Sequence, residues 1–197
     1  QRGCTKRFVV SSVAEGYSLP LVYLAAWRIN AAVAPIDCED RDEELADVIK
    51  RLDAAVVICD AKDAERLGRL TPVPVLAALV AGEACDAPPV PFASDAYAHC
   101  FFTSGSTGRP KGCLVSRNAL ATYARARNRV DAVDATSVLL LASHHAFDPT
   151  VGDVAQCALS RASLCCAPRH DVVFALAELL RTSRCTHITT CLLYTSD

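Results

Sequence analysis

Short apolar runs alternate with amphipathic segments along almost the whole chain. Runs rich in Val, Ile, Leu, Phe and Cys predict strands, at residues 8–10, 33–36, 54–59, 73–76, 97–102, 113–115, 137–142, 163–167 and 186–190. Apolar residues that recur every three or four positions predict helices, at residues 17–30, 42–52, 61–70, 117–129, 151–159 and 172–181. Strands that alternate with helices are typical of parallel sheets covered by helices, so we expect an α/β fold.

The composition changes between residues 81 and 94, where Pro, Ala, Gly and acidic residues predominate. Pro88, Pro89 and Pro91 lie close together there, which is typical of a surface linker. We therefore expect two α/β halves, at about residues 1–80 and 95–190, joined by a Pro-rich linker at residues 81–94.

Composition and charge narrow the class of protein. The 197 residues are 52% apolar with a net charge of −2, which excludes a disordered chain and gives no general electrostatic footprint for nucleic acid. The longest uncharged stretch near the N-terminus, Gly16 to Trp27, is too short to span a membrane. The 11 cysteines lie mostly in apolar runs, without CxxC pairs or metal-ligand spacing. We interpret them as reduced, buried thiols of a cytoplasmic protein with no metal site.

The segment from Thr103 to Gly112 concentrates groups that suit a polyphosphate. It supplies four hydroxyls, three glycines and two cations directly after a predicted strand. Glycines let a backbone approach a ligand closely, hydroxyls donate to oxyanions, and Lys111 adds a mobile charge. The spacing fits neither a Walker A loop, because Pro110 stands where that loop needs Gly, nor G-x-G-x-x-G. An ordinary flexible hairpin loop is the alternative, but one of only four Lys residues beside the glycines favours phosphate binding.

Three segments resemble one known family. Residues 97–120, YAHCFFTSGSTGRPKGCLVSRNAL, resemble the signature of the adenylate-forming (AMP-binding) superfamily, and match T-S-G-S-T-G-x-P-K-G at every fixed position. Residues 24–37, LAAWRINAAVAPID, are similar to a segment that usually reads LAVLKAGAAYVPLD, with Arg28-Ile29-Asn30 in place of Lys-Ala-Gly. Residues 146–153, AFDPTVGD, and 160–164 are similar to a third segment, FDxSVxE…GAxL. The family includes acyl-CoA synthetases, luciferases and the adenylation domains of non-ribosomal peptide synthetases.

The resemblance implies a fold, a reaction and ligands. The implied fold is a truncated large N-terminal domain of an adenylate-forming enzyme, with two parallel-sheet α/β subdomains. The implied reaction joins a carboxylate to ATP, forming an acyl-adenylate and pyrophosphate, before transfer to the thiol of CoA or of carrier-protein phosphopantetheine. Mg²⁺ accompanies the ATP. The residues implied to bind the β- and γ-phosphates are Thr103, Ser104, Gly105, Ser106, Thr107, Gly108 and Lys111.

Asp148 and Phe147 are the implied substrate-binding residues. In amino-acid-activating members of the family the matching Asp pairs with the substrate amino group, which slightly favours an amino acid as substrate. Phe147 would line the same pocket. A carboxylate that only stabilises the N-terminus of the following helix is the alternative for Asp148. We interpret His144 and His145 as structural.

Two features predict that the chain is part of a longer enzyme. Met is absent, and residues 191–197 resemble translated read-through of a sequencing adapter. The family's adenine-binding and ribose-binding segments and its C-terminal lysine do not appear, so the catalytic residue is unknown. We expect a ligase as the intact parent, acting on a small carboxylate or amino acid and partnered by a carrier-protein domain. A fatty or aryl acyl-CoA synthetase is the alternative, and an inactive nucleotide-binding fragment is the alternative of another class.

Overall fold

The computed structural model describes residues 7–14, 16–78, 90, 91, 93, 95–103 and 110–189. The chain forms two compact units, of which the first contains residues 1–14 and 18–118 and the second residues 15–17 and 119–197. This division differs from the one expected at residues 81–94, because the strands that follow the Pro-rich segment pair with the first sheet. Most of that segment, and residues 190–197, lie outside the described residues.

A six-stranded sheet forms the first unit, in the order β4-β3-β1-β2-β5-β6. Its strands are β1 Phe8–Ser12, β2 Ala32–Pro35, β3 Ala54–Cys59, β4 Val75–Ala77, β5 Tyr97–Thr103 and β6 Lys111–Ser116. All neighbouring strands are parallel except β5 and β6, which are antiparallel. Strand β1 is buried along its whole length, as expected for a central strand covered on both faces.

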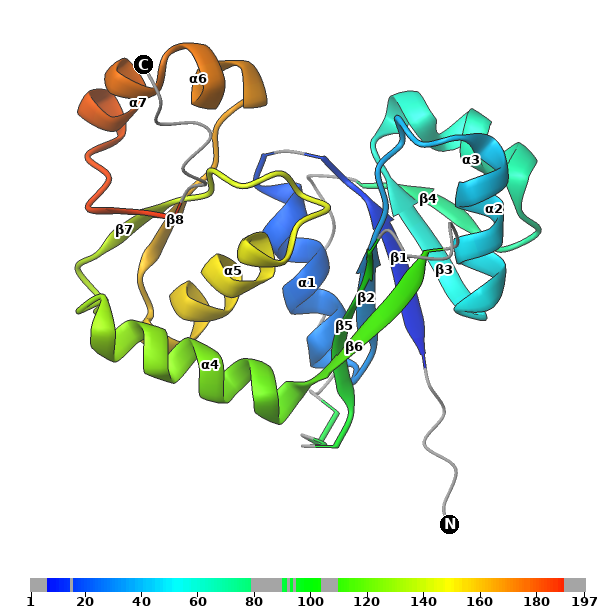
Figure 1. The fold of residues 1–197 in the computed structure, drawn as a ribbon, viewed down its shortest axis with the longest axis horizontal. Coiled ribbons are helices and arrows are strands. Elements are labelled where there is room, and N and C mark those ends of the chain that lie inside the picture. Colours follow the sequence, from blue (N-terminus) through cyan, green and yellow to red (C-terminus); the bar gives the residue numbers. More distant parts are fainter. Residues whose placement is uncertain are drawn as a thin grey trace. The chain divides into compact units, whose positions relative to one another are not determined.

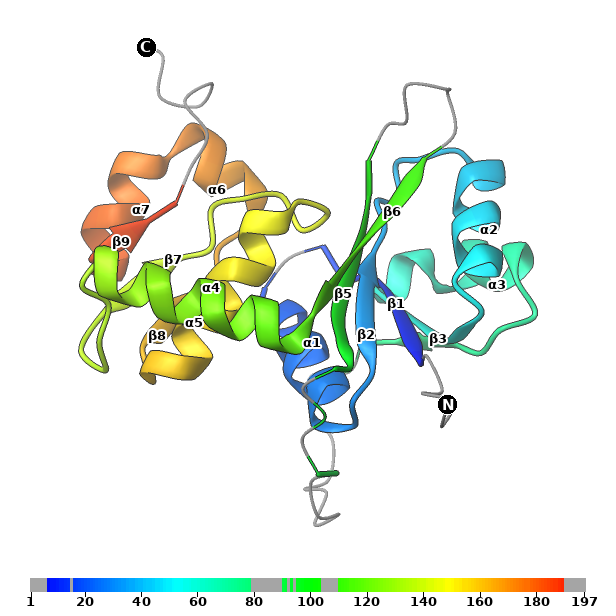
Figure 2. The same cartoon turned by 60° about the horizontal axis from the view of Figure 1, so that its bottom comes forward.

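Helices cover both faces of this sheet. They are α1 Ser18–Arg28, α2 Asp42–Arg51 and α3 Ala64–Leu70, which follows a short 3₁₀ turn, η1, at Ala61–Asp63. Figures 1 and 2 show α2 and α3 on one face and α1 on the other. Helix α2 buries Leu45, Val48 and Ile49 against the core, at the i, i+3, i+4 spacing of one helix face.

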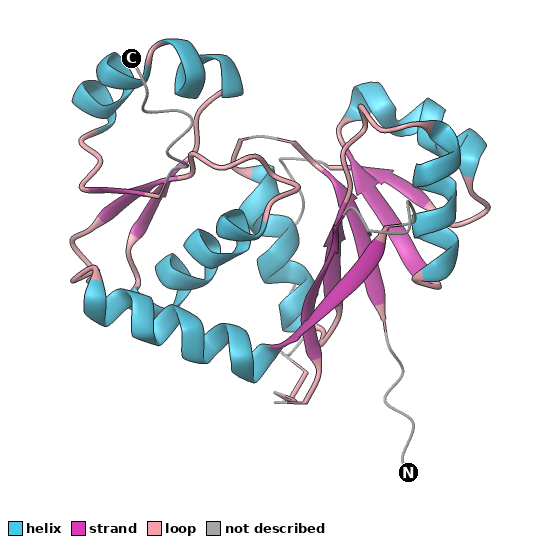
Figure 3. Cartoon of the chain, in the orientation of Figure 1, coloured by secondary structure: helices cyan, strands magenta, loops and turns pink. Residues whose placement is uncertain are grey.

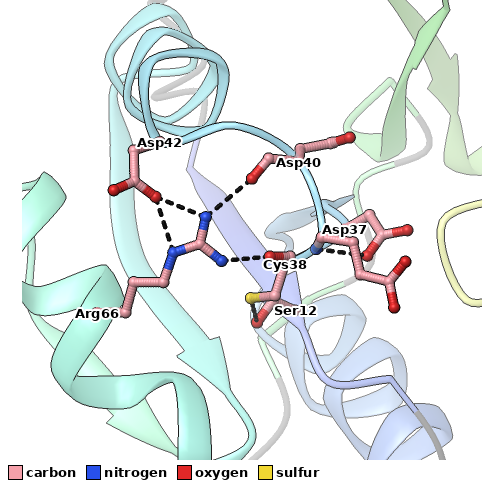
Figure 4. Close-up of polar contacts among 7 residues, drawn as sticks. Ser12, Asp37, Cys38, Asp40, Asp42 and Arg66 are labelled. Atoms are coloured by element: carbon pink, nitrogen blue, oxygen red, sulfur yellow. Dashed lines mark hydrogen bonds and ion pairs between the residues drawn. The ribbon is translucent and has the colours of Figure 1, made fainter.

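The loop between β2 and α2 is held by a single arginine of α3 (Figure 4). The Arg66 guanidinium donates to the Asp42 carboxylate at 2.8 Å, to the backbone carbonyl of Asp40 at 2.9 Å, and to that of Cys38. Asp42 is the first residue of α2, where a carboxylate also interacts favourably with the helix dipole. One side chain therefore fixes the position at which α2 begins.

The second unit contains a three-stranded parallel sheet in the order β8-β7-β9. Its elements are α4 Arg117–Val130, β7 Val138–Leu140, α5 Asp148–Ser160, β8 Ser163–Cys165, α6 Arg169–Phe174, α7 Leu176–Ser183 and β9 His187–Ile188. Successive residues of β7 serve opposite faces, because Leu139 packs with Cys157 of α5 and Leu140 packs with Val172 of α6. Figure 3 shows the helices of this unit on both sides of its strands.

The predicted α/β class with parallel-sheet units is confirmed, and two of the predicted helices differ clearly in extent. The predicted helix 172–181 is two helices, since Ala175 leaves helical geometry with φ −133° and ψ 28°. The predicted helix 151–159 begins earlier, at Asp148, with Pro149 in its first turn. Among the described residues, no helix is both long and apolar enough to cross a membrane.

Candidate phosphate-binding hairpin and its surroundings

Strands β5 and β6 form an antiparallel hairpin that carries the Gly-rich motif between them (Figure 2). The last residue of β5, Thr103, is paired directly with the first residue of β6, Lys111. Strand pairing thus brings Thr103 and Lys111, eight positions apart in sequence, to neighbouring positions on the two strands of the hairpin. Both side chains are exposed. Among the described residues, no carboxylate forms an ion pair with Lys111.

The base of the hairpin is closely packed at Gly112. This residue lies opposite Phe102 in the strand register. A Cβ atom at position 112 would lie 3.0 Å from the Cys100 sulfur and 3.4 Å from the Phe102 ring. A side chain at this position would therefore require the Cys100 and Phe102 side chains to move aside.

The end of helix α2 supports the same region. Arg51 Nη1 donates to the backbone carbonyl of Pro110 at 2.9 Å, and its guanidinium carbon lies 5.4 Å from the centre of the Phe102 ring. Arg51 also forms an ion pair with Asp47 at 3.2 Å, one helical turn earlier. Sequence reasoning did not identify Arg51, because its partner Pro110 is 59 positions away and no spacing rule connects them.

Seven residues were predicted to contact phosphate, and the structure brings Thr103 and Lys111 together. The other five, Ser104, Gly105, Ser106, Thr107 and Gly108, lie outside the described residues. Thr103 and Lys111 thus present an exposed hydroxyl and an exposed ammonium group at paired positions, which are groups that can donate to a phosphate.

The two predicted substrate-binding residues lie at the start of α5 in the second unit. Phe147 precedes the helix and Asp148 is its first residue. Both are exposed, Phe147 by 56%. Among the described residues, no hydrogen bond or ion pair satisfies the Asp148 carboxylate, although as a first-turn carboxylate it also suits the helix dipole. The position is compatible with both interpretations of Asp148.

The turn before α5 is fixed by backbone contacts. The buried Thr150 hydroxyl donates to the carbonyl of His144 at 2.9 Å, and the Phe147 amide donates to the same carbonyl at 2.9 Å. The rings of His144 and Phe147 lie 5.6 Å apart. These contacts hold Phe147 and Asp148 in a defined position at the helix end.

A cavity of about 340 Å³ in the second unit is bordered by a buried carboxyl group that sequence reasoning did not single out. Asp153, in α5, is only 2% exposed, and one of its carboxyl oxygens has no hydrogen-bond partner among the described residues. Burial raises the pKa of Asp153 to about 7, while a hydrogen bond from Thr189 and the charge of Arg127 act in the opposite direction. The only sequence signal for this residue was its place in the AFDPTVGD segment.

Comparison with known proteins decides the family. The family model of AMP-binding enzymes matches residues 3–191. The chain belongs to the AMP-binding enzyme family. The predicted resemblance to adenylate-forming enzymes is thereby confirmed.

The relatives of this AMP-binding chain include several peptide synthetases. The nonribosomal peptide synthetase ivoA of Emericella nidulans is 30% identical over 179 residues, which is 87% of this chain and 10% of that protein. The nonribosomal peptide synthetase fmqA of Aspergillus fumigatus is 26% identical over 174 residues, which is 83% of this chain and 4% of that protein. The chain therefore spans only a small part of the length of these relatives.

Solved structures agree with the AMP-binding fold. The nonribosomal peptide synthetase FmoA3, in its alpha-methyl-L-serine-AMP bound form, matches with a TM-score of 0.81 and 25% identity, over 92% of this chain and 20% of that chain. MatB from Rhodopseudomonas palustris, with ATP bound, matches with a TM-score of 0.82 and 19% identity, over 98% of this chain and 41% of that chain. The second likeness supports the fold alone.

Proposed function

We propose that this chain supplies the polyphosphate-binding part of an enzyme that activates an amino acid by forming an aminoacyl-adenylate from ATP, with release of pyrophosphate. The observation that carries the proposal is the direct pairing of Thr103 with Lys111 at the two ends of the Gly-rich motif. Membership of the AMP-binding family supports the use of ATP.

The chemistry explains why these groups are needed. A carboxylate that attacks the α-phosphorus of ATP meets a strongly anionic polyphosphate, and the departing pyrophosphate carries additional charge. The Lys111 ammonium would bind the β- and γ-phosphates, and the Thr103 hydroxyl would donate to them, together with the backbone and side chains of residues 104–108. Mg²⁺ would enter bound to ATP and supply further positive charge on the phosphates.

An amino acid is the favoured substrate class. The two relatives described above, fmqA and ivoA, are peptide synthetases, and the exposed Asp148 carboxylate is available to pair with an ammonium group. Phe147 would contact the substrate side chain beside it. We further propose transfer of the aminoacyl group to a phosphopantetheine thiol of a carrier-protein domain, in a cytoplasmic enzyme.

Equilibrium binding tests the phosphate part of the proposal with this chain. Calorimetric titration with magnesium tripolyphosphate, which lacks a nucleoside, should give saturable binding. Replacing Lys111→Met should weaken that binding by about tenfold or more, because one charge-assisted contact is lost. Lys62→Met removes a charge from an exposed position in η1, which is not part of the hairpin, and should leave the affinity unchanged. No binding by the unaltered chain would refute phosphate recognition.

Pyrophosphate exchange tests the substrate class in the complete protein. Amino-acid-dependent exchange of radiolabelled pyrophosphate into ATP is the expected result, and Asp148→Ala should impair exchange with amino acids. Exchange with fatty or aryl acids alone would instead support an acyl-CoA synthetase. Phosphate binding without exchange for any acid would support a nucleotide-binding protein without adenylation activity.

A further inference from the structure

We propose that Arg51, the last residue of α2, is a positioning residue for the phosphate-binding hairpin and acts through Lys111. The inference rests on the proposed function, because the hairpin must bind phosphate for its positioning to matter. Three contacts of one guanidinium group carry the argument: one with the backbone beside Lys111, one with the ring beside Thr103, and one with its own helix.

The first contact fixes the backbone at Lys111. Arg51 Nη1 donates to the Pro110 carbonyl at 2.9 Å, and that carbonyl belongs to the peptide group shared with Lys111. Because a peptide group is planar, holding its oxygen also orients the Lys111 amide and places the Lys111 Cα atom. Arg51 therefore constrains where the Lys111 ammonium group can reach.

The second contact fixes the opposite strand. The Arg51 guanidinium lies 5.4 Å from the centre of the Phe102 ring, within the range of a cation–π interaction. The ring also lies close to Gly112, its partner in the register, where a Cβ atom would be only 3.4 Å away. Arg51 thus contacts Phe102 of β5, next to Thr103, and Pro110, which immediately precedes Lys111 and β6.

The third contact keeps Arg51 in this orientation. Asp47, on the preceding turn of α2, accepts from Nη1 at 3.2 Å. Both side chains are about one-third exposed, so the pair contributes little to stability, but it restricts the rotamers of Arg51. Helix α2 is itself anchored in the core by Leu45, Val48 and Ile49. A planar guanidinium can serve a carbonyl, a carboxylate and an aromatic face together, which an ammonium group cannot do.

Binding of magnesium tripolyphosphate to the full chain tests this role. Arg51→Met should weaken binding about three- to tenfold, the range expected when a residue acts by orienting another. Arg51→Lys keeps the charge but not the planar contacts and should give an intermediate loss. Lys50→Met removes an equal charge from the same helix turn, at an exposed position, and should change the affinity by less than about twofold.

A double-mutant cycle distinguishes positioning from simple attraction by charge. If Arg51 acts through Lys111, the loss caused by Lys111→Met should be at least about threefold smaller when Arg51 is already Met. Equal losses for Lys50→Met and Arg51→Met, or strictly additive losses with Lys111→Met, would overturn the inference and leave phosphate binding by Lys111 intact. Absence of binding by the unaltered chain would overturn the proposed function itself.

Thermal unfolding of each variant ensures that only folded proteins are compared. If Arg51→Met does not fold, the same cycle is measured with Arg51→Lys in its place.

Discussion

The ionisable side chains of His99 and Asp153 are almost fully buried, and each has a polar atom without a hydrogen-bond partner among the described residues. His99 lies in β5 of the first unit and Asp153 in α5 of the second. Burial disfavours the charged form of each group, so it lowers the pKa of His99 and raises that of Asp153. The two units should therefore respond to pH in opposite directions.

The first unit should lose stability as the pH falls. Burial lowers the pKa of His99 to about 4, below its usual 6.5, so the unfolded chain binds the proton more readily between these values. The free energy of unfolding should be highest above about pH 6.5 and should fall towards pH 4, by on the order of 3 kcal/mol. Urea unfolding at each pH, followed by the fluorescence of the single tryptophan, Trp27, measures the free energy of unfolding of this unit. Trp27 reports on β5 because its indole donates to the Ala98 carbonyl.

His99→Leu should remove most of this pH dependence, because the buried ring no longer titrates. His170→Gln is the matched control, since His170 is exposed and lies on α6. An equally steep loss of stability in His99→Leu would assign the effect to other groups.

The second unit should lose stability as the pH rises through the same range. The folded-state pKa of Asp153, about 7, lies above its ordinary value of 3.8, so the protonated form stabilises the fold below about pH 4 and this contribution is lost by pH 7. Asp153→Asn is neutral at every pH and should be more stable than the unaltered protein at pH 8, by up to about 4 kcal/mol. Hydrogen exchange of the α5 amides measures the difference. Similar exchange in both proteins at pH 8 would show that Asp153 is stabilised as a carboxylate.

At the scale of elements, Asn30 explains one departure from the family pattern. The segment LAAWRINAAVAPID has Asn30 where the family segment usually has Gly, directly after α1. Asn30 adopts φ 57°, a left-handed conformation that Gly and Asn tolerate better than other residues. Its side chain also donates to the Pro91 carbonyl at 2.8 Å and accepts from Arg117. The substitution preserves the turn and adds contacts.

Asn30→Ala should destabilise the first unit by about 1–2 kcal/mol, because Ala retains neither the left-handed preference nor the hydrogen bonds. Asn30→Gly should cost less, since it keeps the conformation and loses only the contacts. The free energy of unfolding from urea titration, followed by Trp27 fluorescence, gives both values. A larger loss for Gly than for Ala would show that the backbone conformation is unimportant at this position.

The hairpin base should not accept a side chain at position 112. Gly112→Ala places a methyl group 3.0 Å from the Cys100 sulfur, so we expect the Cys100 and Phe102 side chains to shift, at a cost of about 1–3 kcal/mol. Gly68→Ala is the control in α3, where a Cβ meets nothing within 4 Å and should stabilise the helix by about 0.5–1 kcal/mol. Thermal unfolding compares the two variants. Equal midpoints for both would contradict the close packing at Gly112.

The sequence predicted most elements, because their apolar periodicity is set by which face is buried. It did not predict the break at Ala175, where neither Gly nor Pro interrupts the helical pattern. It placed strands at 97–102 and 113–115 but did not distinguish antiparallel from parallel pairing, since an apolar run alone does not specify its partner. For the same reason the division after Asn118 was not predicted, because it depends on β5 joining β2.

At the scale of the whole molecule, the reactivity expected of each thiol depends on its burial in the fold rather than on whether its neighbours in sequence are apolar. The described cysteines are all free, and Cys113, although predicted to lie in an apolar strand, is exposed on β6. Burial raises the pKa values of Cys59, Cys100 and Cys166 to about 11, which keeps these thiols protonated at neutral pH.

Cys113 should therefore react before the other described cysteines. Titration with a disulfide reagent at pH 8, followed by mass spectrometry of the peptides, should find it modified first. Cys113→Ser should remove that fast phase while the buried thiols remain slow. Early modification of Cys59 or Cys100 would contradict the packing described for the first unit.

The antiparallel connection between β5 and β6 has a consequence for the order of folding. The other neighbouring strands of the first sheet are separated in sequence by a crossover or by a long stretch of chain, whereas only residues 104–110 separate β5 from β6. Local pairs lose little loop entropy and form within about 1–10 μs, long before crossover-linked strands assemble. We expect Thr103 and Lys111 to meet early, while the contact from Arg51, which requires the sheet and α2 together, forms last. The β5–β6 hairpin would then exist before helix α2 has docked beside it.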